Sequence, residues 1–277
     1  MLPYFERSGP THNIWRCLGI SILKISEELR CIAIFKPARA LGAEIQAALY
    51  SVLHELSEYA FGGNMEQIWK QKRNKNWLKR VEELLLVVNS NDDIVGLSAY
   101  SVFKEFGYIN IYVDWISVLP GYEGAAAELL RIAMVQRTLA VYRGWRTPVY
   151  VTASTQNPHV YRLASSMVHK GQLYPSVQGG EPPGKILKCA QHLAEHLRGG
   201  KKRPGPGPDL IWRGAYREAL YRADPTRPPA DAIDELFRQL GKNDCFLLVG
   251  AANIQLPDTA PTASGAGAAI RVEPPQP

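Results

Sequence analysis

The chain has 277 residues, of which 46% are hydrophobic and 21% are charged, and its formal net charge is +6. This length fits one large domain or a domain with an appendage, and the apolar share is enough for a substantial core. No apolar run reaches the length of a transmembrane helix, and the N-terminal residues lack the order of a signal peptide, so we expect a cytoplasmic protein without membrane association. The positive charge suits anionic partners, either a nucleotide-containing cofactor or a nucleic acid.

Runs of β-branched and aromatic residues predict strands, and apolar residues recurring at three- and four-residue steps predict helices. In chain order these are strand 29–35, helices 41–60 and 65–77, strands 83–88, 94–103 and 109–118, helix 125–143, strand 148–153, helices 158–169, 186–197, 210–223 and 230–240, and strand 245–250. We expect an irregular lead-in (1–28), a core (29–184), a basic helical extension with a closing strand (185–250) and a disordered tail (251–277).

The four cysteines, Cys17, Cys31, Cys189 and Cys245, are widely scattered. No CxxC pair occurs and no histidine lies at a ligand-like spacing, so the sequence predicts no metal site. His192 and His196 are four residues apart on one predicted helix, but without an evident third ligand we interpret them as part of a solvated face. Buried thiols in a reducing cytoplasm are the expected state of the cysteines.

The stretch 108–135 runs from a strand, through a turn at Pro120–Gly121, into a helix. Such a turn directs free backbone N–H groups outward at the helix start, where the helix dipole favours negative charge. The unit is therefore suited to an anion such as a pyrophosphate.

This order of elements resembles the acetyltransferase superfamily of the Gcn5-related type over residues 29–170. The segment from Phe35 to Ala40 is similar to the end of that family's first strand and the start of its first helix, and Trp115–Gly124 is similar to its coenzyme A-binding strand and loop. The resemblance implies an α/β fold with a mixed, mostly antiparallel sheet flanked by helices. It also implies acyl transfer from acetyl-CoA or another acyl-CoA. The cofactor contacts it implies are Ser117, Val118, Tyr122, Gly124, Ala125, Ala126 and Asn157.

Two features depart from the family pattern. Glu123 stands where the family's loop usually carries Arg or Gln, and the loop is about two residues shorter. A carboxylate is electrostatically unfavourable beside a pyrophosphate unless it points away. In addition, Tyr161 follows Asn157 by four residues, whereas the family usually spaces them by seven. The alternative is a non-catalytic binding or scaffold protein with a degraded cofactor loop.

The candidate catalytic groups each have a structural interpretation as well. Asp114, inside an apolar strand, would have a raised pKa and act as a base if its face is covered, or it could be a structural Asp paired with an Arg. Tyr161, and less so Tyr174, could protonate the leaving thiolate, or could be core residues. Asn157 could bind pantetheine amides, cap a helix, or do both. The thioester oxygen would be held by a backbone N–H near Ser117–Val118.

The partners follow from the same interpretation. The acceptor would be a small-molecule or peptide amine, or a hydroxyl, and segments 58–77 and 171–240 would shape its binding site. Residues 185–222 hold nine Lys or Arg against three acidic residues, with Trp212, Tyr216 and Tyr221 between them. Basic residues with aromatics can bind nucleic acid, but Trp212, Tyr216 and Leu220 also have the spacing of an ordinary helix core stripe, which we favour. The sequence does not indicate the oligomeric state.

Overall fold

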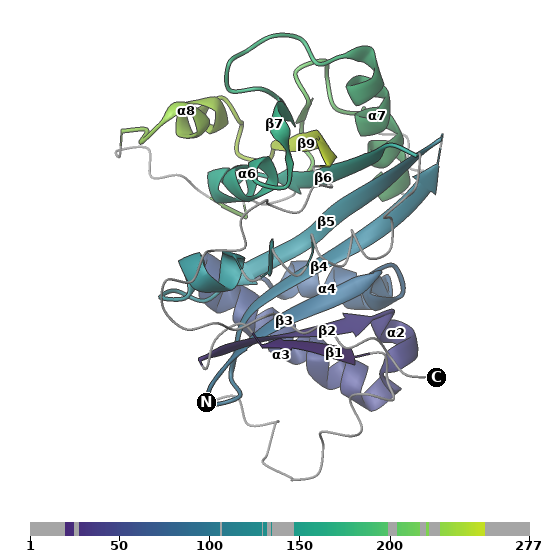
Figure 1. Ribbon diagram of the computed structural model, residues 1–277, viewed down its shortest axis with the longest axis vertical. Helices are drawn as coiled ribbons and strands as arrows, with labels where there is room; N and C mark the ends of the chain where they lie inside the picture. The colour runs from purple at the N-terminus through teal and green to yellow at the C-terminus, as the bar shows by residue number, and fades with distance from the viewer. Residues whose placement is uncertain are drawn as a thin grey trace, which may run out of the picture. The chain divides into compact units, whose positions relative to one another are not determined.

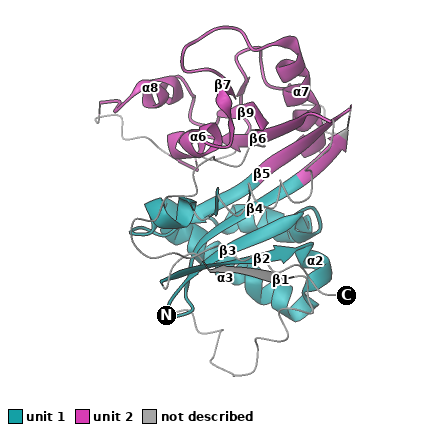
Figure 2. Ribbon diagram, in the orientation of Figure 1, with its two compact units in different colours: residues 1–101, 114–144, 254–277 teal, residues 102–113, 145–253 magenta. Residues whose placement is uncertain are grey.

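The computed structural model describes residues 20–24, 28–105, 107–128, 130–131, 134, 147–198, 204–216, 220–221 and 228–252. The chain divides into two compact units (Figure 2): unit 1 comprises residues 1–101, 114–144 and 254–277, and unit 2 comprises 102–113 and 145–253. Strands β4 (Ile94–Glu105) and β5 (Tyr108–Val118) each contribute residues to both units.

Unit 1 is built on antiparallel strands. The strands β1 (Ile20–Lys24), β2 (Leu29–Phe35), β3 (Glu83–Asn89) and the first part of β4 pair in that order. Between β2 and β3 the chain forms α2 (Pro37–Ala40), α3 (Ala43–Phe61), α4 (Glu66–Asn74) and the 3-10 turn η1 (Trp77–Lys79), as Figure 1 shows.

The β3–β4 hairpin shows how the sequence specifies this sheet. The strand predicted at 83–88 is β3, and every residue of β3 is buried, including the polar Glu83 and Asn89 at its two ends. In the turn, the Asn89 side-chain oxygen accepts hydrogen bonds from the backbone N–H groups of Asn91 and Asp93, both at 2.9 Å. Asp92 adopts a left-handed conformation with φ of 64°, which Asp tolerates better than most residues.

Unit 2 contains the only parallel pair of strands among the described residues. Residues 109–113 of β5 pair in parallel with β6 (Val149–Thr155), and β9 (Cys245–Ala252) pairs antiparallel with β6 on its other edge. β7 (Val168–Tyr174) and the short β8 (Ile211–Trp212) both pair antiparallel with β9. The helices are α6 (Pro158–Ser165), α7 (Gly184–Arg198) and α8 (Ala232–Arg238).

The core of unit 2 forms where α7 covers the sheet. Ile186, Cys189 and Leu193 on one face of α7 pack with Leu247 and Val249 of β9. The ion pairs of Arg162 with Asp231 (2.8 Å) and Asp234 (2.7 Å) connect α6 to α8. Each helix is thereby fixed to its sheet or to its neighbour.

The predicted fold class is confirmed: the sheet is mixed, mostly antiparallel and flanked by helices. All six predicted strands occur, including the closing strand 245–250, and the helices predicted at 41–60, 186–197 and 230–240 match α3, α7 and α8. The helix predicted at 65–77 is divided into α4 and η1. The helix predicted at 125–143 begins at residue 123, and its residues 135–143 lie outside the described part of the chain, as do Cys17 and the tail beyond 252.

Three sequence predictions are wrong in detail. A strand, β1, lies within the range 1–28 that we expected to be irregular. The helix predicted at 158–169 ends at Ser165, because the chain turns into β7, which we did not predict. The predicted tail begins too early, since β9 continues through residues 251 and 252.

The predicted helix 210–223 is also wrong over the described residues of that range. Leu210 and Gly214 have φ values of 58° and 62°, which a right-handed helix does not allow. Ile211 and Trp212 instead pair with Phe246 and Cys245 of β9. The four-residue spacing of Trp212, Tyr216 and Leu220 is therefore not a helical core stripe.

The three described cysteines, Cys31, Cys189 and Cys245, are buried and not in disulfides, as expected. Burial raises the pKa of each thiol to about 12. No helix within the described residues is long and apolar enough to cross a membrane.

Candidate active site

The last part of β5 presents a backbone edge in unit 1. The parallel pairing with β6 involves Ile109–Val113, whereas β5 continues to Val118. Next to β4, the backbone N–H of Leu119 donates to the carbonyl oxygen of Val95 at 2.8 Å. Successive residues of a strand direct their N–H groups to opposite edges, so the N–H of Val118 points away from β4. Of the two residues predicted to hold the thioester oxygen, Ser117 and Val118, the geometry favours Val118.

The loop after β5 is closed by its own backbone. The N–H of Tyr122 donates to the carbonyl of Leu119 at 3.1 Å, and the N–H of Ala126 donates to the carbonyl of Tyr122 at 2.9 Å. Gly121 has a φ of 89°, which favours glycine. Ala126 is buried, and its Cβ lies 3.4 Å from the position that a Cβ would take on Gly96. A small side chain at position 126 is thus needed for close packing against Gly96 of β4.

The outer surface of the loop is open. A Cβ added to Gly124 would meet no atom within 4 Å, and Ala125 is exposed. The Tyr122 hydroxyl lies 3.4 Å from the side-chain amide of Asn89, which donates to it. A ligand could therefore approach the backbone at Gly124 without displacing a side chain packed over it.

The Glu123 side chain forms a hydrogen bond with one of the backbone N–H groups of this loop. Its carboxylate accepts a hydrogen bond from the N–H of Gly121 at 2.7 Å. The pyrophosphate of coenzyme A would need such donors and would be repelled by the carboxylate. The loop in this conformation does not fit a pyrophosphate at Gly121, and it fits one at Gly124 only if Glu123 turns away.

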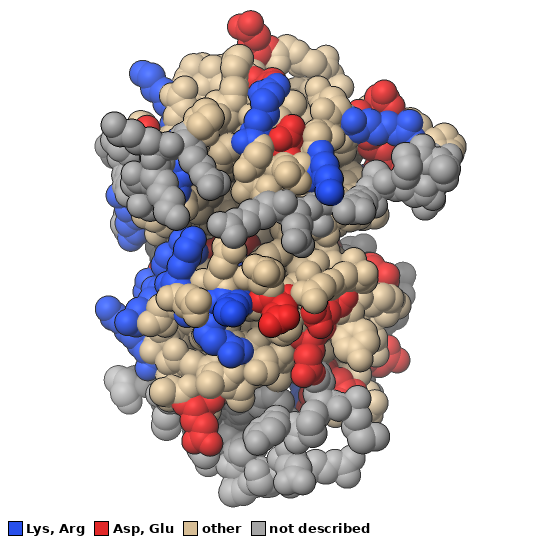
Figure 3. All heavy atoms as spheres, turned by 180° about the vertical axis from the view of Figure 1, so that it is seen from behind, with Lys and Arg blue, Asp and Glu red and all other residues tan. Residues whose placement is uncertain are grey.

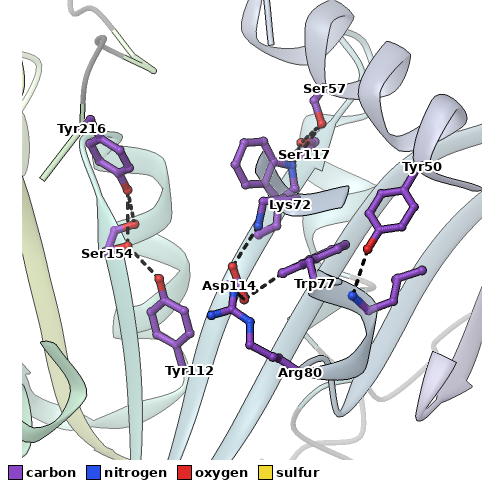
Figure 4. A network of polar contacts seen from close by, with 12 residues as sticks. Tyr50, Ser57, Lys72, Trp77, Arg80, Tyr112, Asp114, Ser117, Ser154 and Tyr216 are labelled. Atoms are coloured by element: carbon purple, nitrogen blue, oxygen red, sulfur yellow. Dashed lines mark hydrogen bonds and ion pairs between the residues drawn. The ribbon is translucent and has the colours of Figure 1, made fainter. Parts of the chain in front are cut away.

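Asp114 lies in a charged network with residues of α4 and η1 (Figure 4). Its carboxylate accepts hydrogen bonds from Lys72 Nζ at 2.9 Å and Trp77 Nε1 at 2.8 Å, and Arg80 lies at 3.9 Å. The Asp114 and Lys72 side chains are only 10% and 12% exposed. Both carboxylate oxygens are thus engaged, which matches the alternative interpretation of a structural, paired Asp.

Three tryptophan rings surround the Lys72 ammonium. Its Nζ lies 4.2 Å from the ring centroid of Trp77, 4.8 Å from Trp115 and 5.8 Å from Trp69. Burial lowers the pKa of Lys72, and the facing Asp114 carboxylate acts in the opposite direction. The aromatic faces and the carboxylate together stabilise an ammonium group out of water.

Asp114 and its neighbour Trp115 do not point to opposite faces of β5 as adjacent strand residues usually do. Strict alternation along β5 would place Asp114 with Tyr112 and Ile116, opposite Trp115. In the structure both Asp114 and Trp115 approach the same Lys72 side chain. The alternation therefore does not separate this pair of side chains.

Ser117 is buried rather than open to a ligand. Its Oγ accepts a hydrogen bond from Trp115 Nε1 at 2.8 Å and lies 3.5 Å from the Oγ of Ser57 on α3. The same indole N–H also lies 3.1 Å from the Ser57 Oγ. These contacts hold α3 against the end of β5 and fix the backbone of the candidate site.

The two candidates of unit 2 have structural partners. The Tyr161 hydroxyl donates to the carbonyl of Pro175 at 2.9 Å, its ring packs on Phe237, and burial raises its pKa. The Asn157 side chain accepts from the N–H of His159 at 2.9 Å, which caps α6. The structure therefore confirms the capping interpretation of Asn157 and places Tyr161 in the core.

A second polar network, in unit 2, was not predicted. The Ser154 hydroxyl lies 2.8 Å from that of Tyr112 and 3.3 Å from that of Tyr216. Lys72 was missed as well, although a lysine three residues after Trp69 on the inner side of a helix is a detectable signal. Partners so distant in sequence, such as Ser154 and Tyr216, leave no local pattern.

No protein-family model matches this sequence, and no curated protein matches it. Several solved structures match this chain. A GCN5-related N-acetyltransferase from Kribbella flavida is 17% identical, and the match covers 49% of this chain and 32% of that one, with a TM-score of 0.32. An aminoglycoside acetyltransferase from an uncultured soil metagenomic sample is 16% identical over 53% and 93% of the chains, with a TM-score of 0.37. An Escherichia coli GNAT family N-acetyltransferase in complex with CoA is 15% identical over 42% and 61%, with a TM-score of 0.29.

The chain resembles Gcn5-related acetyltransferases in fold. The element order and the parallel β5–β6 pair agree with the resemblance that the sequence shows. The chain spans about a third of the Kribbella flavida protein. These likenesses concern the fold alone.

Proposed function

We propose that this chain is an acyltransferase that moves an acetyl or other acyl group from acyl-coenzyme A to an amine. The observation that carries the proposal is the edge of β5. The N–H of Val118 points away from β4, and a loop with an open backbone at Gly124 follows directly. Acyl-coenzyme A needs a backbone donor for its thioester oxygen and, in the turn that follows, further donors for its phosphates. The end of β5 and its loop offer these two features in that order.

Bound coenzyme would supply an activated thioester. In the proposal, Val118 donates its N–H to the thioester oxygen, while Tyr122, Gly124, Ala125 and Ala126 shape the loop. Ser117 acts through Trp115 and Ser57 by holding the strand in place. In the proposal Asp114 acts as the base after the acceptor displaces one of its two hydrogen-bond donors, Lys72 Nζ or Trp77 Nε1. Asn157 is a proposed cofactor contact through the part of its side chain not used in capping.

A small-molecule amine is the proposed acceptor class. The surroundings of Asp114 hold one ammonium group, that of Lys72, against a carboxylate and aromatic rings, so an acceptor amine would bind there by taking the place of Lys72. An amine acceptor needs this chemistry in order to bind and then to lose its proton. The three buried, unpaired thiols support a location in the reducing cytoplasm.

A non-catalytic binding protein is the second candidate, and Glu123 is the observation that favours it. Its carboxylate already accepts the Gly121 N–H and so takes the place of an external anion. Because the Gly121 N–H already has an acceptor, the loop does not need a pyrophosphate as a hydrogen-bond partner at this position. The two functions therefore differ in whether this loop binds coenzyme A.

Calorimetric titration with acetyl-CoA at moderate salt tests the proposal. Micromolar binding that is lost in Gly124→Leu would support it, because a Cβ at this position meets no protein atom within 4 Å and the added side chain would obstruct a ligand. Gly63→Leu is the matched control, since Gly63 also has open space around it. Absence of binding in the wild type and in Glu123→Gln would reject the acyltransferase and leave the binding protein.

Glu123→Gln separates the remaining possibilities. The amide is neutral, so repulsion of a pyrophosphate is removed while the side-chain length is kept. If the carboxylate competes with the cofactor, the variant should bind acetyl-CoA at least about tenfold more tightly, which corresponds to about 1.4 kcal/mol. Unchanged affinity would mean that Glu123 turns away in the bound state.

A further inference from the structure

Unit 1 carries a strongly basic surface that lies outside the proposed cofactor loop. Residues 70–80 include six Lys or Arg and no Asp or Glu. Lys72 points inward, but Lys70, Arg73, Lys75, Lys79 and Arg80 are exposed. Arg39, on α2, is exposed too, and α2 lies against η1. We call these six exposed residues, Arg39 included, the α4–η1 basic surface.

These charges are not neutralised within the described residues. Arg80 is the only one with an ion pair there, a long contact of 3.9 Å to Asp114, and Arg73 lies over the ring of Tyr50 at 5.7 Å. The others form no ion pair in the described part of the chain. Figure 3 shows Lys and Arg gathered on one side of unit 1 and Asp and Glu gathered on the other side of that face.

A structural explanation accounts for only part of this surface. Cations in the last turn of a helix are favoured by the helix dipole, which applies to Arg73 and to Lys75 at the end of α4. It does not apply to Lys70, Lys79 or Arg39. Several unpaired like charges on one surface repel each other. A bound anion would reduce this electrostatic repulsion, which, apart from the long contact of Arg80 to Asp114, no acidic side chain of the described residues offsets.

We propose that the α4–η1 basic surface binds the phosphate backbone of a nucleic acid. The residues between the cations favour this class of partner, because Gln67, Gln71, Asn74 and Asn76 are all exposed amides. Lys and Arg with Asn and Gln are the side chains that bind phosphates and sugars. The segment exposes no large apolar side chain, which a membrane surface or an apolar peptide groove would require.

The proposed nucleic-acid site differs from residues 185–222, the basic segment that the sequence analysis considered for this role. In the range 185–222, Lys185 and Lys188 lie on the exposed side of α7, and Arg213 is paired with Asp209 at 2.7 Å. Over the described residues of 210–223, the helix that would have aligned the aromatics with the cations is not formed. The inference does not depend on acyl transfer, because no residue of the α4–η1 basic surface belongs to the proposed cofactor loop.

Fluorescence anisotropy with a labelled DNA duplex and the RNA duplex of the same sequence, at increasing potassium chloride, tests the inference. The wild type should bind at least one of them, with a linear fall of log K against log salt. The combined variant Lys70→Gln, Lys75→Gln, Lys79→Gln should show a slope that is shallower by about 0.9 for each lost contact, or ~2.7 in total. All three side chains are exposed, so the fold should be retained, and circular dichroism checks this.

The matched control removes the same charge from unit 2. Lys170, Lys185 and Lys188 are exposed, and their combined substitution by Gln should leave the slope unchanged. Equal loss in both triple variants would overturn the inference, because it would show attraction by net charge alone. No binding to either duplex would also overturn it, as would binding of poly-glutamate with the same dependence on Lys70, Lys75 and Lys79, which would indicate an acidic protein partner.

Discussion

The two units each contain a polar network at β5, but the networks differ in charge. In unit 1, Asp114 is bound by Lys72, with Trp77 as a neutral donor. In unit 2, the hydroxyl groups of Tyr112, Ser154 and Tyr216 are connected to one another by contacts between neutral groups (Figure 4). The residues come from the same strand, two positions apart, so the difference arises from the helix or strand that each one meets.

The difference in charge indicates which network tolerates the loss of one of its members less well. Removing one member of a buried ion pair leaves an uncompensated charge, whereas a hydroxyl that loses a partner can rotate to another acceptor or to water. The charged network therefore fixes α4 to β5, and the hydroxyl network of unit 2 is more tolerant of substitution. Three predictions test this comparison.

The largest effect is expected for Asp114→Asn. The variant keeps the shape of the side chain but leaves the Lys72 ammonium without its counter-charge among tryptophan rings. The free energy of unfolding should fall by about 3 kcal/mol, measured by urea denaturation at neutral pH. Ser154→Ala, the corresponding change in unit 2, should cost only about 1 kcal/mol.

The double variant Asp114→Asn, Lys72→Met decides whether charge is the cause. It removes both charges, so it should recover a large part of the lost stability. If the double variant is as unstable as Asp114→Asn, shape rather than charge holds α4 to β5. Equal costs for Asp114→Asn and Ser154→Ala would remove the distinction between the two networks.

A smaller effect is expected for Trp115→Phe. The change removes the indole N–H that lies within hydrogen-bond distance of both the Ser117 and Ser57 hydroxyls, which are buried. A buried group that loses its partner costs roughly 1–2 kcal/mol, again measured by urea denaturation. Tyr216→Phe in unit 2 removes a hydroxyl whose contacts with Ser154 are longer, at 3.2 and 3.3 Å, and should cost about 0.5 kcal/mol or less. The reverse order would contradict the comparison.

The sequence predicts best where one local property decides the structure. The run Glu83–Asn89 is a buried strand because its apolar residues are uninterrupted, and Asn157 before Pro158 marks the start of α6. The strand at 83–88 and the helix start at Pro158 were predicted, since both depend on a few neighbouring residues, whereas the capping role of Asn157 was one of two alternatives left open. Asp114 was recognised as unusual for the same reason, a carboxylate within an apolar strand.

The errors occur where distant partners decide. Asp114 meets Lys72, which is 42 positions away, so no local pattern could distinguish a base from a paired carboxylate. β7 has three consecutive exposed residues and depends on pairing with β9, about eighty positions later. Trp212 has helical spacing from Tyr216, yet it pairs with Cys245 of β9 and lies in the strand β8. Tertiary pairing overrides local periodicity in these segments.

The last prediction concerns two of the buried thiols, Cys31 in unit 1 and Cys189 in unit 2. Burial raises the folded-state pKa of Cys31 and of Cys189 to about 12, from 9.0. A raised pKa means that the folded state retains the proton, so the stabilisation is complete below pH 9 and is lost as the pH rises toward 12. Between pH 9 and pH 10 each thiol should lower the free energy of unfolding by about 1 kcal/mol.

Variants isolate this contribution from the other groups that titrate in the same range. Cys31→Ala and Cys189→Ala should each reduce the loss of stability between pH 9 and pH 10 by that amount, whatever their own effect at neutral pH. Both thiols owe the raised pKa chiefly to burial, so the two reductions should be similar even though the networks near them differ in charge. A reduction in one variant only would show that one unit opens to solvent before the other, because a thiol in an opened unit titrates at its ordinary pKa.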